Sequence, residues 1–212
     1  ALLAKTGGIP WKLQREPRAS LVVGFGAKRL RGSTYVGTTV CFDNTGLFRE
    51  FGTFESGIDG FGREIQSAIE AYVKHSNTKI GKLVIHYYKA FSSKEAQKVE
   101  STLSELDLDI PYIVLTVNQT RTKDAICFDT GYRELMPTSG TIIQISKMNE
   151  YLLFNNTRYE EYPSTRVDFS YPVKIRISYS RHIDTGNREI IKELIDEVYQ
   201  FSRMYWRSVR QK

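Results

Sequence analysis

Cations and flat aromatic rings gather at both ends of this 212-residue chain, a combination that suits the backbone and the bases of a nucleic acid. Glu16 is the only acid among the first forty residues, against seven cations: Lys5, Lys12, Arg15, Arg18, Lys28, Arg29 and Arg31. The last ten residues contain four cations and no acid: Arg203, Arg207, Arg210 and Lys212. The net charge is +6, so the middle of the chain is mildly acidic. Either the two ends meet in one phosphate-binding surface, or they are a solvated basic surface and a flexible tail.

Other site chemistries have less support in the sequence. The three histidines, His75, His86 and His182, stand too far apart for the close ligand spacing of a zinc site. Gly24-Phe25-Gly26 lacks the remaining residues of a dinucleotide-binding or phosphate-binding loop. The glycine-rich segment Gly57–Gly62 is interpreted as a flexible turn. The cations are therefore the strongest candidates for a functional role.

Hydrophobic patterning predicts the elements that must position these residues. Early strands are expected at Leu21–Phe25, Tyr35–Phe42, Leu47–Phe54, Lys82–Tyr88 and Tyr112–Val117, with a hairpin turn at Asp43–Gly46. Later strand pieces are expected near Ala125–Phe128, Thr141–Ile145, Tyr151–Phe154 and Val173–Tyr179. Helices are predicted at Arg63–His75, at Lys94–Leu106 after a capping Ser92, and from about Arg188 to the end. The element order predicts an α/β fold, a ribonuclease-H-like mixed sheet flanked by helices.

Several segments, in this order along the chain, resemble the PIWI domain of short prokaryotic Argonautes, the ribonuclease-H-like lobe of those proteins. They are Lys5–Trp11, Ser20–Gly26, Leu83–Lys89, Tyr132–Thr141, Tyr151–Asn156, Tyr171–Ile177 and Phe201–Arg210. The resemblance implies one PIWI domain over residues 1–212. It also implies a MID domain upstream, and nothing here resembles that domain. The sequence stops before the proline-containing stretch and terminal carboxylate with which Argonautes usually end.

The resemblance also implies where an active nuclease of this family would hold two Mg²⁺ ions. The three matching positions are occupied by Gly26, Tyr88 and Arg203. Glycine and tyrosine offer no carboxylate, and an arginine repels a cation. We therefore expect no cleavage and no catalytic cofactor. One alternative is an active nuclease whose metal site is rebuilt from Asp43, Glu55, Asp59 or Glu64. Another is a scaffold module that mainly binds protein.

By the same resemblance, the expected partners are a guide strand and its paired target, whether RNA or DNA, and an accessory effector protein in defence against invading nucleic acid. The expected binding residues are Lys5, Lys12, Lys28, Arg29, Arg31, Arg203, Arg207 and Arg210. Mg²⁺ is expected only at the guide 5′ phosphate. No apolar run approaches the roughly 18 residues of a membrane helix, and no secretory signal is visible, so a cytoplasmic protein without membrane insertion is expected.

Overall fold

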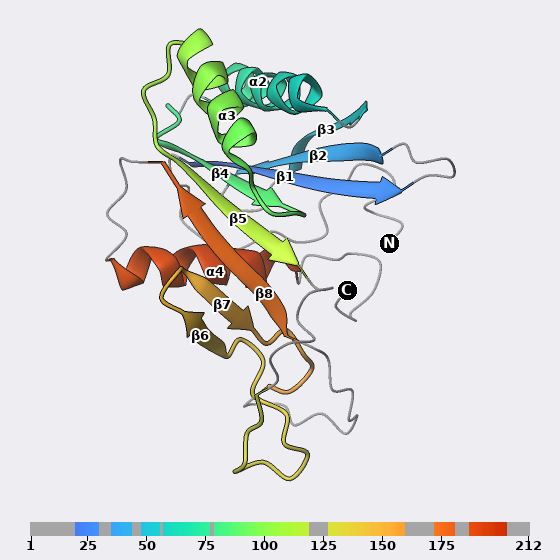
Figure 1. Cartoon of the computed structure of the whole chain (residues 1–212), viewed down its shortest axis with the longest axis vertical. Helices are drawn as coiled ribbons and strands as arrows, with labels where there is room; N and C mark the ends of the chain where they lie inside the picture. Colours follow the sequence, from blue (N-terminus) through green and yellow to red (C-terminus); the bar gives the residue numbers. More distant parts are fainter. Residues whose placement is uncertain are drawn as a thin grey trace. The chain divides into compact units, whose positions relative to one another are not determined.

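A computed structural model describes residues 20–29, 35–43, 48–55, 57–76, 79–118, 127–159, 172–180 and 187–202. These residues divide into two compact units. The core unit contains the described residues from 20 to 116 and from 177 to 180, and the C-terminal unit contains those from 117 to 176 and from 187 to 202. Figure 1 shows the elements of both.

The core unit is built around five strands in the order β3-β2-β1-β4-β5. Its elements are β1 (Ser20–Arg29), β2 (Tyr35–Asp43), β3 (Phe48–Glu55), α2 (Ile58–His75), β4 (Lys82–Tyr87), α3 (Ser93–Glu105) and β5 (Tyr112–Asn118). Strand β1 pairs antiparallel with β2 and parallel with β4, and β4 pairs parallel with β5. The prediction of a mixed sheet with the ribonuclease-H-like element order is confirmed.

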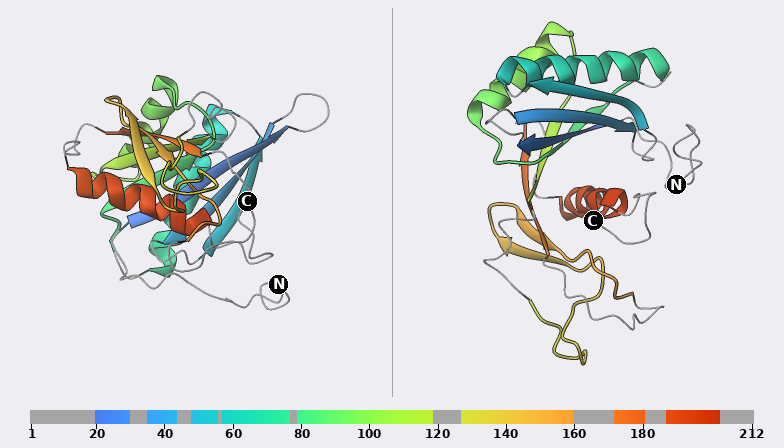
Figure 2. Two further views of the ribbon diagram at one scale, coloured as in Figure 1. Left: turned by 90° about the horizontal axis from the view of Figure 1, so that it is seen from below. Right: turned by 90° about the vertical axis from the view of Figure 1, so that its right-hand side faces the viewer.

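Helices α2 and α3 lie side by side against one face of these strands (Figure 2). Leu21, Val23 and Phe25 of β1 point to the helices, because successive side chains alternate between the two faces of a strand. They pack in one apolar cluster with Ile65 and Ile69 of α2. Val22 and Val84, on the other face of the sheet, are also fully buried. The centre of the sheet is therefore buried on both faces, as is usual for parallel strands.

The interpretation of Gly57–Gly62 as a flexible turn is wrong, because α2 begins at Ile58 and includes most of this segment. Gly62 faces α3 so closely that an added Cβ would lie 2.3 Å from Lys98 Cε. Phe61 is buried between Phe25 and Tyr87. Burial of this ring and the close approach of α3 offset the low helix propensity of glycine.

Helix α3 confirms the predicted cap. The Ser92 hydroxyl accepts a hydrogen bond from the Glu95 N–H at 3.3 Å, and the Glu95 carboxylate accepts one from the Ser92 N–H at 2.8 Å. This reciprocal capping box satisfies two N–H groups at the start of the helix. It also brings the Glu95 side chain back toward the end of β4.

The C-terminal unit contains an antiparallel sheet in the order β8-β7-β6 and the helix α4. Its elements are β6 (Ile142–Ser146), β7 (Glu150–Leu153), β8 (Val173–Tyr179, whose last three residues belong to the core unit) and α4 (Arg188–Ser202). These bounds confirm the late strand predictions and the helix start at Arg188. The strand expected near Ala125–Phe128 is wrong for its described residues, because Cys127 and Phe128 are irregular and lead into a turn at Asp129.

Hydrogen bonds fix α4 to the segments before and after the β6–β7 hairpin. The Asn155 side chain donates to Ser202 Oγ at 2.8 Å, and the hydroxyls of Ser139 and Tyr199 lie 3.0 Å apart. Leu194, Ile195 and Val198 of α4 are buried, as the helical spacing of the sequence predicts. No helix in the described part of the chain is long and apolar enough to span a membrane.

Arg158 organises the irregular segment between residues 129 and 140 of the C-terminal unit. Its guanidinium lies 2.6 Å from Asp129 Oδ2, donates to the Met136 carbonyl, and stacks 3.7 Å from the centre of the Tyr132 ring. The hydrogen bond from Arg158 holds the pKa of Asp129 below its usual value. One arginine thus joins three points of a segment that has no regular secondary structure.

Candidate functional site

Gly26 and Tyr88 each follow the last paired residues of the parallel strands β1 and β4, toward the carboxyl edge of these strands. The parallel register of β1 and β4 runs from Ser20 opposite Lys82 to Phe25 opposite Tyr87. Gly26 is the next residue of β1, and Tyr88 is the first residue after the end of β4. Glycine has no side chain, and the tyrosine ring lies 5.1 Å from that of Tyr87. Neither position therefore offers a carboxylate ligand for Mg²⁺.

Four acids are candidate ligands of a rebuilt metal site, and the structure describes the side chains of two of them, Asp59 and Glu64. The Asp59 side chain is 77% exposed and lies 3.6 Å from Lys98 Nζ. The Glu64 carboxylate lies over Gly52, where an added Cβ would be 2.3 Å from Oε2. Asp43 and Glu55 end β2 and β3, and their side chains lie outside the described residues. Within the described ranges, no three His, Cys, Asp or Glu side chains group closely enough to share a metal ion.

A buried carboxylate, Glu95, ties the end of β4 to the start of α3. Its Oε1 accepts a hydrogen bond from the Tyr87 hydroxyl at 2.5 Å and lies 2.9 Å from Lys89 Nζ. Its Oε2 accepts from the N–H and the hydroxyl of Ser92, both at 2.8 Å. Burial opposes ionisation of Glu95, but these hydrogen bonds outweigh it and hold its pKa below the usual value. The carboxylate is therefore charged and fully paired.

The same carboxylate changes the protonation of its two partners. Burial, together with the hydrogen bond to Glu95, raises the pKa of Tyr87, so its hydroxyl keeps its proton and donates. The hydrogen bond to Glu95 also raises the pKa of Lys89, whose side chain is 52% exposed. Lys89 thus remains a cation at the surface while Tyr87 remains a neutral donor in the interior.

A cavity of about 600 Å³ opens beside this network, and we call it the aromatic cavity. Four rings and two lysines contribute to its lining: Phe54, Phe61, Tyr87, Tyr88, Lys89 and Lys94. All of the described residues that line it belong to the core unit. Ala27, which follows Gly26 on β1, also lines it, so the cavity adjoins the edge where Gly26 and Tyr88 lie.

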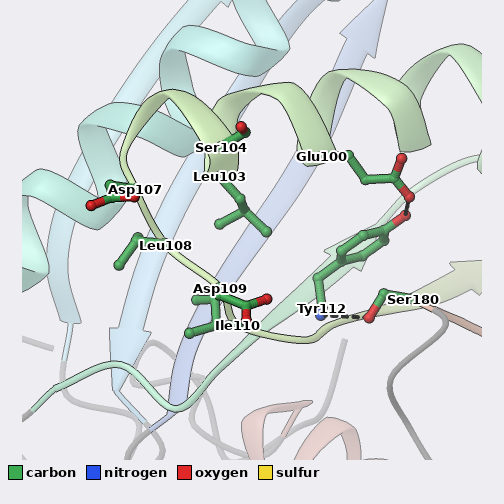
Figure 3. Close-up of a pocket in the computed structure, with 9 residues that line it drawn as sticks. All are labelled: Glu100, Leu103, Ser104, Asp107, Leu108, Asp109, Ile110, Tyr112 and Ser180. Atoms are coloured by element: carbon green, nitrogen blue, oxygen red, sulfur yellow. Dashed lines mark hydrogen bonds between the residues drawn. The ribbon is translucent and has the colours of Figure 1, made fainter.

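A second cavity in the core unit, of about 560 Å³, has the opposite charge (Figure 3). We call it the acidic cavity, because Glu100, Asp107 and Asp109 line it near the end of α3. The Tyr112 hydroxyl donates to Glu100 at 3.2 Å, and burial with the Glu100 charge raises the pKa of Tyr112 to about 12. Three carboxylates near a helix C-terminus repel phosphate, so this cavity does not suit a nucleic-acid strand.

Most of the predicted nucleic-acid-binding cations fall outside the described residues: Lys5, Lys12, Arg31, Arg203, Arg207 and Arg210. The same is true of the 5′-phosphate metal site and of the joined basic surface, which depend on the two ends of the chain. The backbones of Lys28 and Arg29 extend β1 just beyond Gly26, but their side chains are outside the description.

Sequence reasoning missed the residues of the aromatic cavity. Two signals were present in the chain: the capping-box spacing of Ser92 and Glu95, and the run Tyr87-Tyr88-Lys89 at the end of a strand. Neither shows that Phe54, more than thirty residues earlier, lies against the same space. That proximity follows from the pairing of β3 with β2 and of β2 with β1.

No family model matches the sequence, and no curated protein does. Solved structures do match. Marinitoga piezophila Argonaute in complex with a 5′-OH guide RNA aligns with a TM-score of 0.64 and 17% identity, over 90% of this chain and 26% of that one. The A. aeolicus Argonaute aligns with a TM-score of 0.63 and 17% identity, over 100% of this chain and 29% of that one. The chain thus has the PIWI-like, ribonuclease-H-like fold, and it spans less than a third of the length of these Argonautes.

Proposed function

We propose that this chain is the PIWI domain of a prokaryotic Argonaute that binds a guide strand with its paired target and does not cut the target. The observation that carries the proposal is that Gly26 and Tyr88, which each follow the last paired residues of β1 and β4, offer no carboxylate. The fold supports a nucleic-acid partner, because one matching structure is the M. piezophila Argonaute with guide RNA and target DNA.

Base pairing reads sequence in such a complex, so the protein needs contacts to the backbone and to the shape of the duplex. The basic ends of the chain supply positive charge for this purpose. Lys94 adds a cation beside the edge that carries Gly26 and Tyr88, whereas Lys89 in the same lining is paired with Glu95. The acidic cavity at the end of α3 would repel a strand that strayed from this edge.

One way in which binding without cleavage can have a biological effect is through a second protein that responds to the bound state. We therefore propose that target recognition is passed to an accessory effector, in defence against invading nucleic acid. The signal would be the bound state of the target, because this chain offers no carboxylates at positions 26 and 88 to end that state by cleavage.

The test is a cleavage and binding assay on the full-length protein that contains this chain. The protein is loaded with a guide, then incubated with a labelled matching target in Mg²⁺ or Mn²⁺. We expect a stable, salt-dependent ternary complex and an intact target. Specific cutting opposite the guide, abolished by Asp59→Ala or Glu55→Ala, would support the rebuilt nuclease instead. Absence of salt-dependent guide binding would support the protein-binding scaffold.

A further inference from the structure

We propose that the aromatic cavity is a nucleotide subsite that takes up one nucleobase of the bound target strand, with the adjoining phosphate held by Lys94. This inference rests on the proposed function, since it assumes that a target strand passes the edge of the sheet at Gly26 and Tyr88. It adds a place where a single base leaves the duplex and stacks on protein rings.

The rings of the cavity are fixed by one another. Phe25 meets the edge of Phe54 at 6.0 Å between ring centres, and Phe61 meets Tyr87 at 5.4 Å. Phe54 and Tyr88 are half-buried, so part of each ring remains accessible from the cavity. A volume of about 600 Å³ is within the range of small-ligand sites and larger than one base needs. Rigid rings that are already in place stack a base at little entropic cost.

The charged side chains that line the aromatic cavity favour an anionic ligand. Glu95 is the only acid among the described residues that line the cavity, and its oxygens are occupied by Tyr87, Lys89 and Ser92. Lys89 is neutralised by that carboxylate, whereas Lys94 forms no ion pair with any described residue and is exposed. Lys94 also lies in the first turn of α3, where the helix dipole favours negative charge. A nucleotide combines a flat apolar base with an anionic phosphate, and it matches both features.

Gly37 sets the position of the Phe54 ring. An added Cβ at Gly37 would lie 2.3 Å from Cε1 and 2.4 Å from Cζ of Phe54, so the ring lies directly on the glycine backbone. A side chain at residue 37 would push the ring from this place. Gly37 is therefore a positioning residue for the stacking surface, and it does not itself contact the base.

The first experiment needs no variant. The full-length, guide-loaded protein is bound to target strands in which 5-iodouracil replaces one base at a time, and the complexes are irradiated. This base cross-links to aromatic side chains against which it stacks. We expect one target position, or two neighbouring ones, to cross-link to a peptide that contains Phe54 or Tyr88. Target binding without a cross-link to either peptide at any position would overturn the inference and leave the proposed function intact.

The second experiment measures target affinity in variants. Phe54→Leu should weaken target binding by about fivefold or more and leave guide binding unchanged, because one base–ring stack is lost. Lys94→Ala should weaken binding and lower its salt dependence by nearly one unit of slope. The matched controls are Phe128→Leu and Lys74→Ala, which change an exposed ring and an exposed lysine outside the cavity.

The outcomes separate the two proposals. An effect of Lys94→Ala with none of Phe54→Leu, and without cross-links, would indicate a backbone contact alone and overturn base uptake. Loss of all guide and target binding by the wild-type protein would instead overturn the proposed function. Thermal unfolding of each variant shows whether it is folded, and the cross-linking result stands for the wild type in either case.

Discussion

The Tyr87 hydroxyl donates a hydrogen bond to Glu95 Oε1 over 2.5 Å, and this bond joins the last residue of β4 to the first turn of α3. Both groups are buried. The loop between them, which carries Tyr88 and Lys89, is thereby held at both ends. The hydrogen bonds of Glu95 therefore fix the position of the segment that lines the aromatic cavity between β4 and α3.

Glu95→Gln should destabilise the protein by about 2 kcal/mol, because charge-assisted hydrogen bonds from Tyr87, Lys89 and Ser92 are lost or weakened in a buried place. Chemical denaturation of the two proteins measures the difference. Glu105→Gln is the control, since Glu105 is exposed near the end of the same helix, and it should change stability by less than about 0.5 kcal/mol.

The contribution of Glu95 should depend on pH in the acid range. Its folded-state pKa is lowered, so its contribution is fully present above the usual carboxyl pKa of about 4.3 and is lost as the pH falls through the lowered value. We expect the stability difference between wild type and Glu95→Gln to be constant from pH 5 to pH 7 and to shrink below about pH 4. A difference that grew on acidification would contradict the assignment.

Two glycine substitutions should have opposite effects. At Gly62 the atoms nearest to an added methyl group are Cε, Cδ and Cγ of the Lys98 side chain, which is flexible and can move, and alanine favours the helix. Gly62→Ala should therefore be neutral or raise stability by up to about 1 kcal/mol. At Gly37 the methyl group meets the ring of Phe54, so Gly37→Ala should cost about 1–3 kcal/mol. The melting temperature of Gly62→Ala should equal or exceed that of the wild type, and the melting temperature of Gly37→Ala should lie clearly below it.

Arg158→Lys should loosen the segment between residues 129 and 140. Lysine keeps the charge but cannot both stack flat on Tyr132 and reach Asp129 and the Met136 carbonyl at the same time. We expect a loss of about 1–2 kcal/mol and faster amide hydrogen exchange in this segment. Arg133→Lys, an exposed position in the same segment, should leave the exchange unchanged.

The last ten residues give a prediction from sequence alone. Arg207 and Arg210 are three residues apart, so on a continued helix they share a face, and we expect both to contact guide phosphates near the 5′ end. Replacing both with alanine should weaken guide binding and reduce the slope of log affinity against log salt by about 0.7–0.9 for each lost contact. An unchanged slope would show that neither arginine binds phosphate.

Local sequence patterns predicted the bounds of those helices and strands that are determined by residues within the element itself. The bounds of β8 and the start of α4 follow from periodicity, and the cap at Ser92 follows from the spacing to Glu95. The start of α2 did not follow, because Gly60 and Gly62 are poor helix formers and only their packing stabilises them there. Likewise the adjacency of Gly26 and Tyr88 could be expected from the fold, whereas the ring of Phe54 reaches the site through two strand pairings that no local pattern encodes.

The parallel pairing of β1 with β4 constrains the order in which the chain can assemble. Its paired residues lie about 60 positions apart, whereas the β1–β2 and β2–β3 pairs each join strands that are consecutive in the chain. The β1–β2–β3 meander and the helix α2 can therefore form early from local contacts. In the completed sheet β4 lies between β1 and β5, and the segments that carry Gly26 and Tyr88 come together only when β4 pairs with β1. The edge that carries the aromatic cavity is thus a feature of the completed sheet, and a partly folded chain cannot bind through it.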